Sequence, residues 1–69
     1  MTPNEALDAY LRSLPTRVRI AKSRDIREIC QKTASVLYDW RHGRSKIDIA
    51  WQAKITEAIG VNIFINCES

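Results

Sequence analysis

Basic side chains gather in the middle of this 69-residue chain, where their number suits the binding of a polyanion. Residues 17–46 contain nine lysines and arginines against three acidic residues, a net charge of +6, whereas the segments on either side are slightly negative. Because ammonium and guanidinium groups pair with phosphate, this uneven distribution favours a surface that faces an anionic polymer. A solvated basic surface is an equally good interpretation of the charge alone.

The other reactive residue types are too few and too scattered for catalysis or metal binding. His42 is the only histidine, and the two cysteines lie far from it in sequence, so the ligands of a zinc site are missing. No nucleophile–base pair stands out. Cys30 is expected as a small buried hydrophobe and Cys67 as an exposed tail thiol, both reduced. We therefore expect a protein that is not an enzyme and has no metal, cofactor or small-molecule ligand.

The elements that must position the basic residues are predicted to be helices, since two glycines and two prolines leave little material for the turns of a β fold. Thr2 and Glu5 form a capping-box pattern around Pro3, which predicts a helix over 3–13. Three further helices are expected after polar N-cap residues: 24–31 after Ser23, 34–42 after Thr33 and 49–59 after Asp48. Gly43 and Gly60 stand where a left-handed residue ends a helix. Trp40 is expected in the core and Trp51 to be partly buried.

Residues 15–22 have two interpretations. Val18 and Ile20 alternate with arginines in a short strand pattern, although a linker fits equally well. A strand here would pair with residues 61–66, which begin with Val61, end with Asn66 and also alternate. The expected fold class is therefore all-α, a compact domain of four or five helices, with a small C-terminal two-stranded ribbon left open.

Residues 40–61 resemble the second half of a lambda-repressor-like (Cro/CI-type, XRE) helix-turn-helix DNA-binding domain. In that family a recognition helix ends in a large apolar residue, two residues precede a glycine, a basic or small polar loop follows, and the next helix ends in Leu-Gly-Val. Here the corresponding residues are Trp40, Gly43-Arg44-Ser45-Lys46 and Ile59-Gly60-Val61. The resemblance covers about residues 23–61 of a single domain spanning 1–69. Gln31, Lys32 and Thr33 would form the short connection between its two central helices.

The resemblance implies a small sequence-specific regulator of transcription, a repressor of phage or mobile-element type, that binds double-stranded DNA with residues 34–42 in the major groove. A homodimer is expected because one such module covers only a half-site, with Trp51, residues 61–66 or both at the interface. The residues expected to face base edges are Ala34, Ser35, Tyr38 and Asp39. Those expected to face the DNA backbone are Ser23, Arg24, Thr33, His42, Arg44, Ser45 and Lys46.

An alternative is a protein-interaction module that keeps this fold, which the short or acidic side chains at the base-facing positions favour. An antitoxin of the same fold is a further alternative. Arg27 and Arg41 are interpreted as solvated helix residues in either case. No signal-peptide pattern and no apolar run near the roughly 20 residues of a membrane span are evident. We therefore expect a cytoplasmic protein without a membrane partner.

Overall fold

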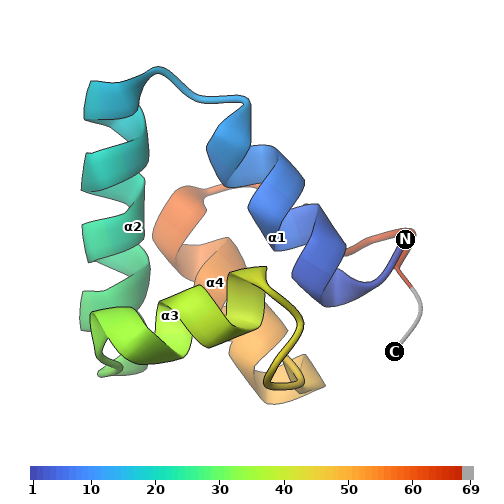
Figure 1. The fold of residues 1–69 in the computed structure, drawn as a ribbon. Helices are drawn as coiled ribbons and strands as arrows, with labels where there is room; N and C mark the ends of the chain where they lie inside the picture. Colours follow the sequence, from blue (N-terminus) through green and yellow to red (C-terminus); the bar gives the residue numbers. More distant parts are fainter. Residues whose placement is uncertain (68–69) are drawn as a thin grey trace.

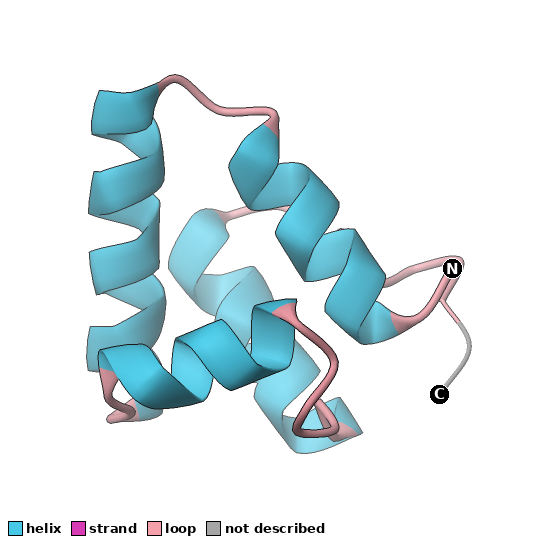
Figure 2. Cartoon of the chain, in the orientation of Figure 1, coloured by secondary structure: helices cyan, strands magenta, loops and turns pink. Residues whose placement is uncertain are grey.

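Four helices make up the computed structural model, which describes residues 1–67. They are α1 (Pro3–Arg12), α2 (Thr16–Cys30), α3 (Ala34–Arg41) and α4 (Ile49–Ile59). Those 67 residues contain no strand, so the chain is all-α (Figure 2). In Figure 1, α2 stands along one side, α1 crosses above, α3 lies across the front and α4 passes behind α3. None of the described helices has the length and apolar character required to cross a membrane.

The start of α1 is the expected capping box. The Thr2 hydroxyl accepts a hydrogen bond from the Glu5 amide at 3.2 Å, and the Glu5 carboxylate accepts one from the Thr2 amide at 2.9 Å. The hydrogen bond that the carboxylate accepts from the Thr2 amide, together with the nearby Thr2 side chain, holds the pKa of Glu5 below its usual value, because both favour the ionised carboxylate. Two otherwise unpaired amides of the first turn are satisfied in this way, which fixes where the helix begins.

The second helix begins at Thr16, so the strand and linker interpretations of residues 15–22 are both wrong. Ser23 lies in the middle of α2 and is not an N-cap. A contact that favours the helix is made by Arg19: its Nε donates to the Leu11 carbonyl at 3.0 Å and its Nη2 to the Leu14 carbonyl at 3.2 Å. A helical Arg19 thereby adds hydrogen bonds to two carbonyls at and just after the end of α1, although the Leu11 carbonyl also accepts from the Leu14 amide at 3.2 Å.

The C-terminal segment forms turns, and the ribbon that the sequence left open is not present among residues 1–67. The alternation in its sequence reflects a turn with one buried side chain and not a strand, because Phe64 is buried in the core whereas Ile65 is 76% exposed. The Asn62 side chain accepts a hydrogen bond from the Phe64 amide at 2.9 Å, which closes a local turn. The segment expected to supply the partner strand is part of α2.

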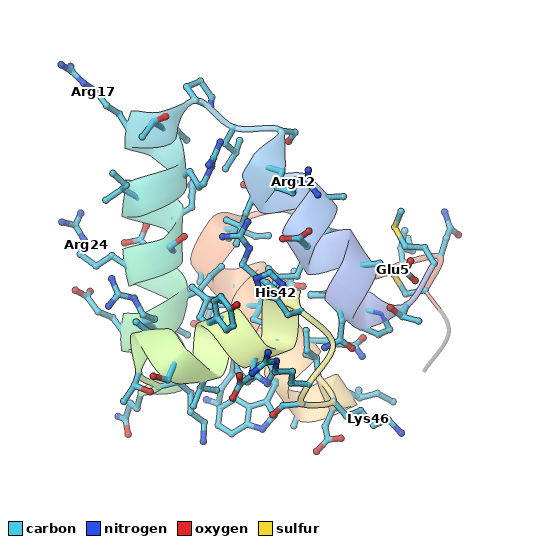
Figure 3. The ribbon with its side chains drawn as sticks, viewed as in Figure 1. Glu5, Arg12, Arg17, Arg24, His42 and Lys46 are labelled. Carbon is cyan, nitrogen blue, oxygen red and sulfur yellow. The ribbon has the colours of Figure 1, made fainter. Side chains whose placement is uncertain are left out.

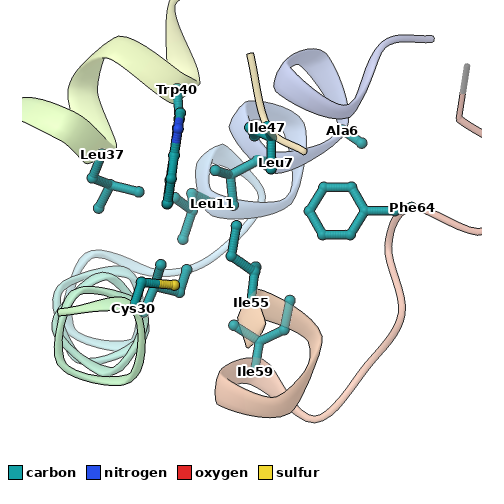
Figure 4. Close-up of a cluster of buried hydrophobic side chains, with 11 residues drawn as sticks. Ala6, Leu7, Leu11, Cys30, Leu37, Trp40, Ile47, Ile55, Ile59 and Phe64 are labelled. Atoms are coloured by element: carbon teal, nitrogen blue, oxygen red, sulfur yellow. The ribbon is translucent and has the colours of Figure 1, made fainter. Parts of the chain in front are cut away.

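One cluster of buried side chains joins all four helices and the C-terminal turn (Figure 4). Trp40 is only 3% exposed, which confirms it as core. Trp51 is half-buried as expected; its ring lies 6.0 Å from that of Trp40, and the Lys32 ammonium lies 4.6 Å from its centroid. Cys30 is buried, and burial raises the pKa of its thiol, whereas Cys67 is half-buried and not the exposed thiol that we expected.

The backbone of Gln31 leads to a stability prediction. This residue ends α2 with φ 54° and ψ 45°, a left-handed conformation that costs a residue with a Cβ about 1 kcal/mol more than glycine. Gln31→Gly should therefore raise the melting temperature by several degrees in a thermal scan followed by circular dichroism. Gly60→Ala is the matched control: Gly60 has φ 77°, and nothing lies within 4 Å of the position that an added methyl group would take, so backbone strain alone should lower the melting temperature. An unchanged or lower melting temperature for Gln31→Gly would contradict the prediction.

Candidate nucleic-acid interface

Helices α2 and α3 are joined by three residues, as the sequence predicts, since α2 ends at Cys30 and α3 begins at Ala34. Thr33 is confirmed as the N-cap of α3, where its hydroxyl accepts a hydrogen bond from the Val36 amide at 3.4 Å. So short a connection forces α3 to leave the direction of α2 steeply, as Figure 1 shows. The outer side of α3 is thus presented to solvent at the front of the molecule.

The two sides of α3 differ sharply in burial. Leu37 and Trp40 point inward and are buried in the core. Ala34, Ser35 and Tyr38 are exposed, and they share one side of the helix because their spacing is i, i+1 and i+4. Asp39, which we expected with them, is half-buried and lies at the margin of this outer surface. We use the name α3 outer face for Ala34, Ser35 and Tyr38.

Tyr38 stands at the centre of a small aromatic and cationic cluster. The residue is 52% exposed, and the His42 ring lies against its ring with a centroid distance of 4.1 Å and a tilt of 36°. The Arg44 guanidinium carbon lies 5.7 Å from the Tyr38 centroid, within the range of a cation–π contact. His42 and Arg44 are themselves exposed, and His42 can be seen in Figure 3. The cluster places a positive charge beside the α3 outer face.

The loop after α3, residues 42–46, carries the other predicted basic residues. Gly43 has φ 74°, and the Arg44 amide donates to the Asp39 carbonyl at 2.9 Å, so the chain turns sharply at the end of α3. Arg44 and Lys46 are exposed and Ser45 is half-buried. The positive charges of Arg44 and Lys46 therefore flank the C-terminal end of the α3 outer face.

Ser23 and Arg24 do not lie where the sequence pattern predicts. They belong to the interior of α2 and not to a helix N-terminus, so neither presents a free backbone amide at a helix start. Ser23 is half-buried, whereas Arg24 extends from the outer side of α2 together with Arg17 (Figure 3). The predicted backbone-facing residues near α3 are thus Thr33, His42, Arg44, Ser45 and Lys46.

Comparison with known proteins identifies no relative of this chain. No family model, curated protein or solved structure matches the chain. Within residues 1–67, no group of three or more histidine, cysteine, aspartate or glutamate side chains is arranged to hold a metal ion. What the α3 outer face can do is therefore inferred from its own side chains: hydrogen bonding by Ser35, apolar contact by Ala34 and Tyr38, and anion pairing by the cations beside them.

Contacts that α1 makes with α3 and with the loop after it support this region, and the sequence patterns did not predict them, although the i, i+4 spacing of Asp8 and Arg12 does predict the ion pair within α1. Asn4 donates to two main-chain carbonyls, those of Trp40 and Ser45, at 2.7 Å each. Asp8, one turn later, accepts a hydrogen bond from Arg41 Nε at 2.9 Å and lies 3.6 Å from Arg12. The interpretation of Arg41 as a solvated residue is therefore wrong. The only signal in the sequence was that Asn4 and Asp8 are i, i+4 neighbours on one helix, which does not reveal partners about 35 residues away.

Proposed function

We propose that this chain is a sequence-specific double-stranded-DNA-binding regulator of transcription, a helix-turn-helix protein of the lambda-repressor-like type, with α3 in the major groove. The observation that carries the proposal is the α3 outer face: Ser35 and Tyr38 are free of the core and flanked by the cations of residues 42–46, while the opposite side of the same helix is anchored by Trp40. A helix presented in this way fits a groove about 12 Å wide.

Base edges would be contacted by the short and aromatic side chains of α3. The Ser35 hydroxyl can donate or accept a hydrogen bond, so it suits several base edges. Ala34 and the Tyr38 ring suit the methyl group of thymine, and Asp39 at the margin can accept from the amino group of cytosine. Together these contacts favour particular sequences, which is why the proposal includes specificity.

Phosphate contacts would come from the residues around this surface. Arg44 and Lys46 supply full positive charges, and Thr33, His42 and Ser45 supply polar groups near the ends of α3. Ser23 and Arg24 are left out of the proposed contacts because they are not at a helix start. Such contacts fix the position of α3 on the duplex and carry no sequence choice of their own.

The test of this function is binding to a pool of random duplexes at low salt, followed by sequencing of the retained DNA. Enrichment of a defined sequence, with an affinity that falls as salt rises by about 0.9 in log–log slope for each phosphate neutralised, is the expected result. Retention without enrichment would leave a nonspecific DNA-binding protein. No retention at any salt concentration would contradict the proposal and favour the protein-interaction or antitoxin alternative.

We further propose that the protein binds as a homodimer, since a repressor of this type reads two half-sites. Trp51 is a poor candidate for the interface because Lys32 and Trp40 already contact its ring. Better candidates are the exposed apolar side chains of Ile49, Val61 and Ile65, which lie on α4 or just after it. Residues 47–69 carry a net charge of −2, so this part of the chain suits a protein partner better than it suits DNA.

Ile65→Lys is predicted to prevent dimerisation. Sedimentation at high concentration should show the wild-type chain as a dimer and the variant as a monomer, and binding to an inverted repeat should weaken about a hundredfold through the loss of avidity. Ile20→Lys is the matched control, because Ile20 is 61% exposed but lies on α2. A wild-type chain that sediments as a monomer with and without the enriched DNA would rule out the dimer.

A further inference from the structure

Asn4 joins the beginning of α1 to the last turn of α3 and to the loop that follows it. Its side-chain nitrogen donates to the Trp40 carbonyl in the last turn of α3 and to the Ser45 carbonyl in the loop, each at 2.7 Å. The two bonds use both hydrogens of one amide group. Asn4 is half-buried, so these carbonyls are held by a protein group where water has limited access.

We propose that Asn4 is a positioning residue for DNA binding, which acts by holding residues 42–46 in the conformation that presents Arg44 and Lys46 to phosphate. This inference rests on the proposed function. Ser45 lies directly between the two cations, so fixing its carbonyl fixes the backbone from which both side chains extend. A loop that is ordered before binding avoids the loss of conformational freedom that a mobile loop would suffer on the DNA.

The other contacts of this loop run to α3 or lie at its ends: His42 and Arg44 pack against Tyr38 of α3, and Ile47, directly after the loop, is buried in the core. The Arg44 amide donates to the Asp39 carbonyl within the end of α3 itself, and Arg41, just before the loop, pairs with Asp8 on α1. Beyond the loop, the Gln52 side chain donates to the Ile47 carbonyl at 2.9 Å. Within residues 1–67, Asn4 is therefore the side chain whose hydrogen bond ties the loop carbonyl of Ser45 to a different helix.

The test uses Asn4→Ala and Asn4→Asp, both of which remove the donor. Asn4 is the second residue of α1, where an acidic side chain favours the helix, so Asn4→Asp keeps the start of α1 while its carboxylate repels the two carbonyl oxygens and should loosen the loop at least as much as Asn4→Ala. Gly60→Ala serves as a control that is destabilised at the far end of α4. All variants are compared at a temperature at which circular dichroism shows them to be folded.

The first measurement is amide hydrogen exchange without DNA. Loss of the two hydrogen bonds should make the Arg44 amide exchange about tenfold faster in both Asn4 variants and leave it unchanged in Gly60→Ala. Unchanged exchange in the Asn4 variants would overturn the proposal. Because no DNA is present, this result stands apart from the fate of the proposed function.

The second measurement is a double-mutant cycle on binding to the DNA enriched by selection. Asn4→Ala should weaken binding about tenfold in the wild-type background and less than about twofold when Arg44→Ala and Lys46→Ala are already present. A general structural role would produce the same loss in both backgrounds, and that result would overturn the proposal. If the wild-type chain binds no duplex, the proposed function fails, and with it the role of Asn4 in DNA binding.

Discussion

Trp40→Ala is expected to unfold this protein. The side chain is 3% exposed and enters the buried cluster from α3 beside Leu37 (Figure 4). Truncating a buried tryptophan to alanine costs about 3–5 kcal/mol, whereas a chain of this length has a total stability of roughly 3–10 kcal/mol. The far-ultraviolet circular dichroism of the variant should therefore show little helix at 37 °C, with no cooperative thermal transition.

Two comparisons separate this effect from a general sensitivity to aromatic loss. Trp40→Phe keeps a large ring in the cluster and should fold with a lowered melting temperature. Trp51→Ala removes a half-buried ring and should also remain folded. A cooperative transition in Trp40→Ala within about 1 kcal/mol of the wild-type stability would mean that the core does not depend on this side chain.

The ends of the helices were predictable wherever a short-range pattern sets them. Thr2 with Glu5, and Thr33 before α3, cap their helices with hydrogen bonds to residues three positions away, so the sequence contains all the information needed. Gly60 ends α4 with a positive φ for an equally local reason. Asp48 is the N-cap residue of α4, as predicted from its residue type. Its side chain makes no capping hydrogen bond, so the reason given for that prediction does not hold.

The start of α2 was not predictable in the same way. The side-chain alternation of residues 17–20 is typical of a strand, and Ser23 is a good N-cap residue type. A contact that favours the helix is made by Arg19, whose hydrogen bonds reach back to the carbonyls of Leu11 and Leu14 across the turn between α1 and α2. Such contacts depend on where two helices meet and leave no periodic signal in the sequence. Because residues 17–20 are helical, the strand that we expected to pair with residues 61–66 does not exist.

The candidate site was predictable in its exposed side chains and not in its supports. The burial of Leu37 and Trp40 follows from their i, i+3 spacing, which leaves Ala34, Ser35 and Tyr38 on the other side of α3. The contact of Tyr38 with His42 and Arg44, and above all the bonds from Asn4 across about 40 residues, required the folded chain. A periodic pattern of apolar residues does not predict which polar side chains will donate to distant backbone carbonyls, because an asparagine that makes such bonds has the same place in the pattern as one that does not.

The double substitution Ser35→Ala/Tyr38→Ala is expected to abolish sequence preference while leaving the fold intact. Both side chains lie on the α3 outer face, and neither belongs to the buried cluster. Each base-edge contact contributes about 1–3 kcal/mol of discrimination, so the ratio of affinities for enriched and random duplexes should fall by roughly a hundredfold. Fluorescence anisotropy with the two duplexes at one salt concentration measures this ratio directly.

Arg44→Ala/Lys46→Ala provides the contrasting control, because both residues are exposed cations outside the α3 outer face. This variant should bind the enriched and the random duplex more weakly by a similar factor, and the slope of log affinity against log salt should fall by about 1.8, or 0.9 for each lost phosphate contact. If the Ser35 and Tyr38 substitutions also weakened both duplexes equally, α3 would contact only the backbone and would not read sequence. If neither variant changed binding, the DNA surface would lie elsewhere, and the exposed arginines of α2, Arg17 and Arg24, would be the next residues to substitute.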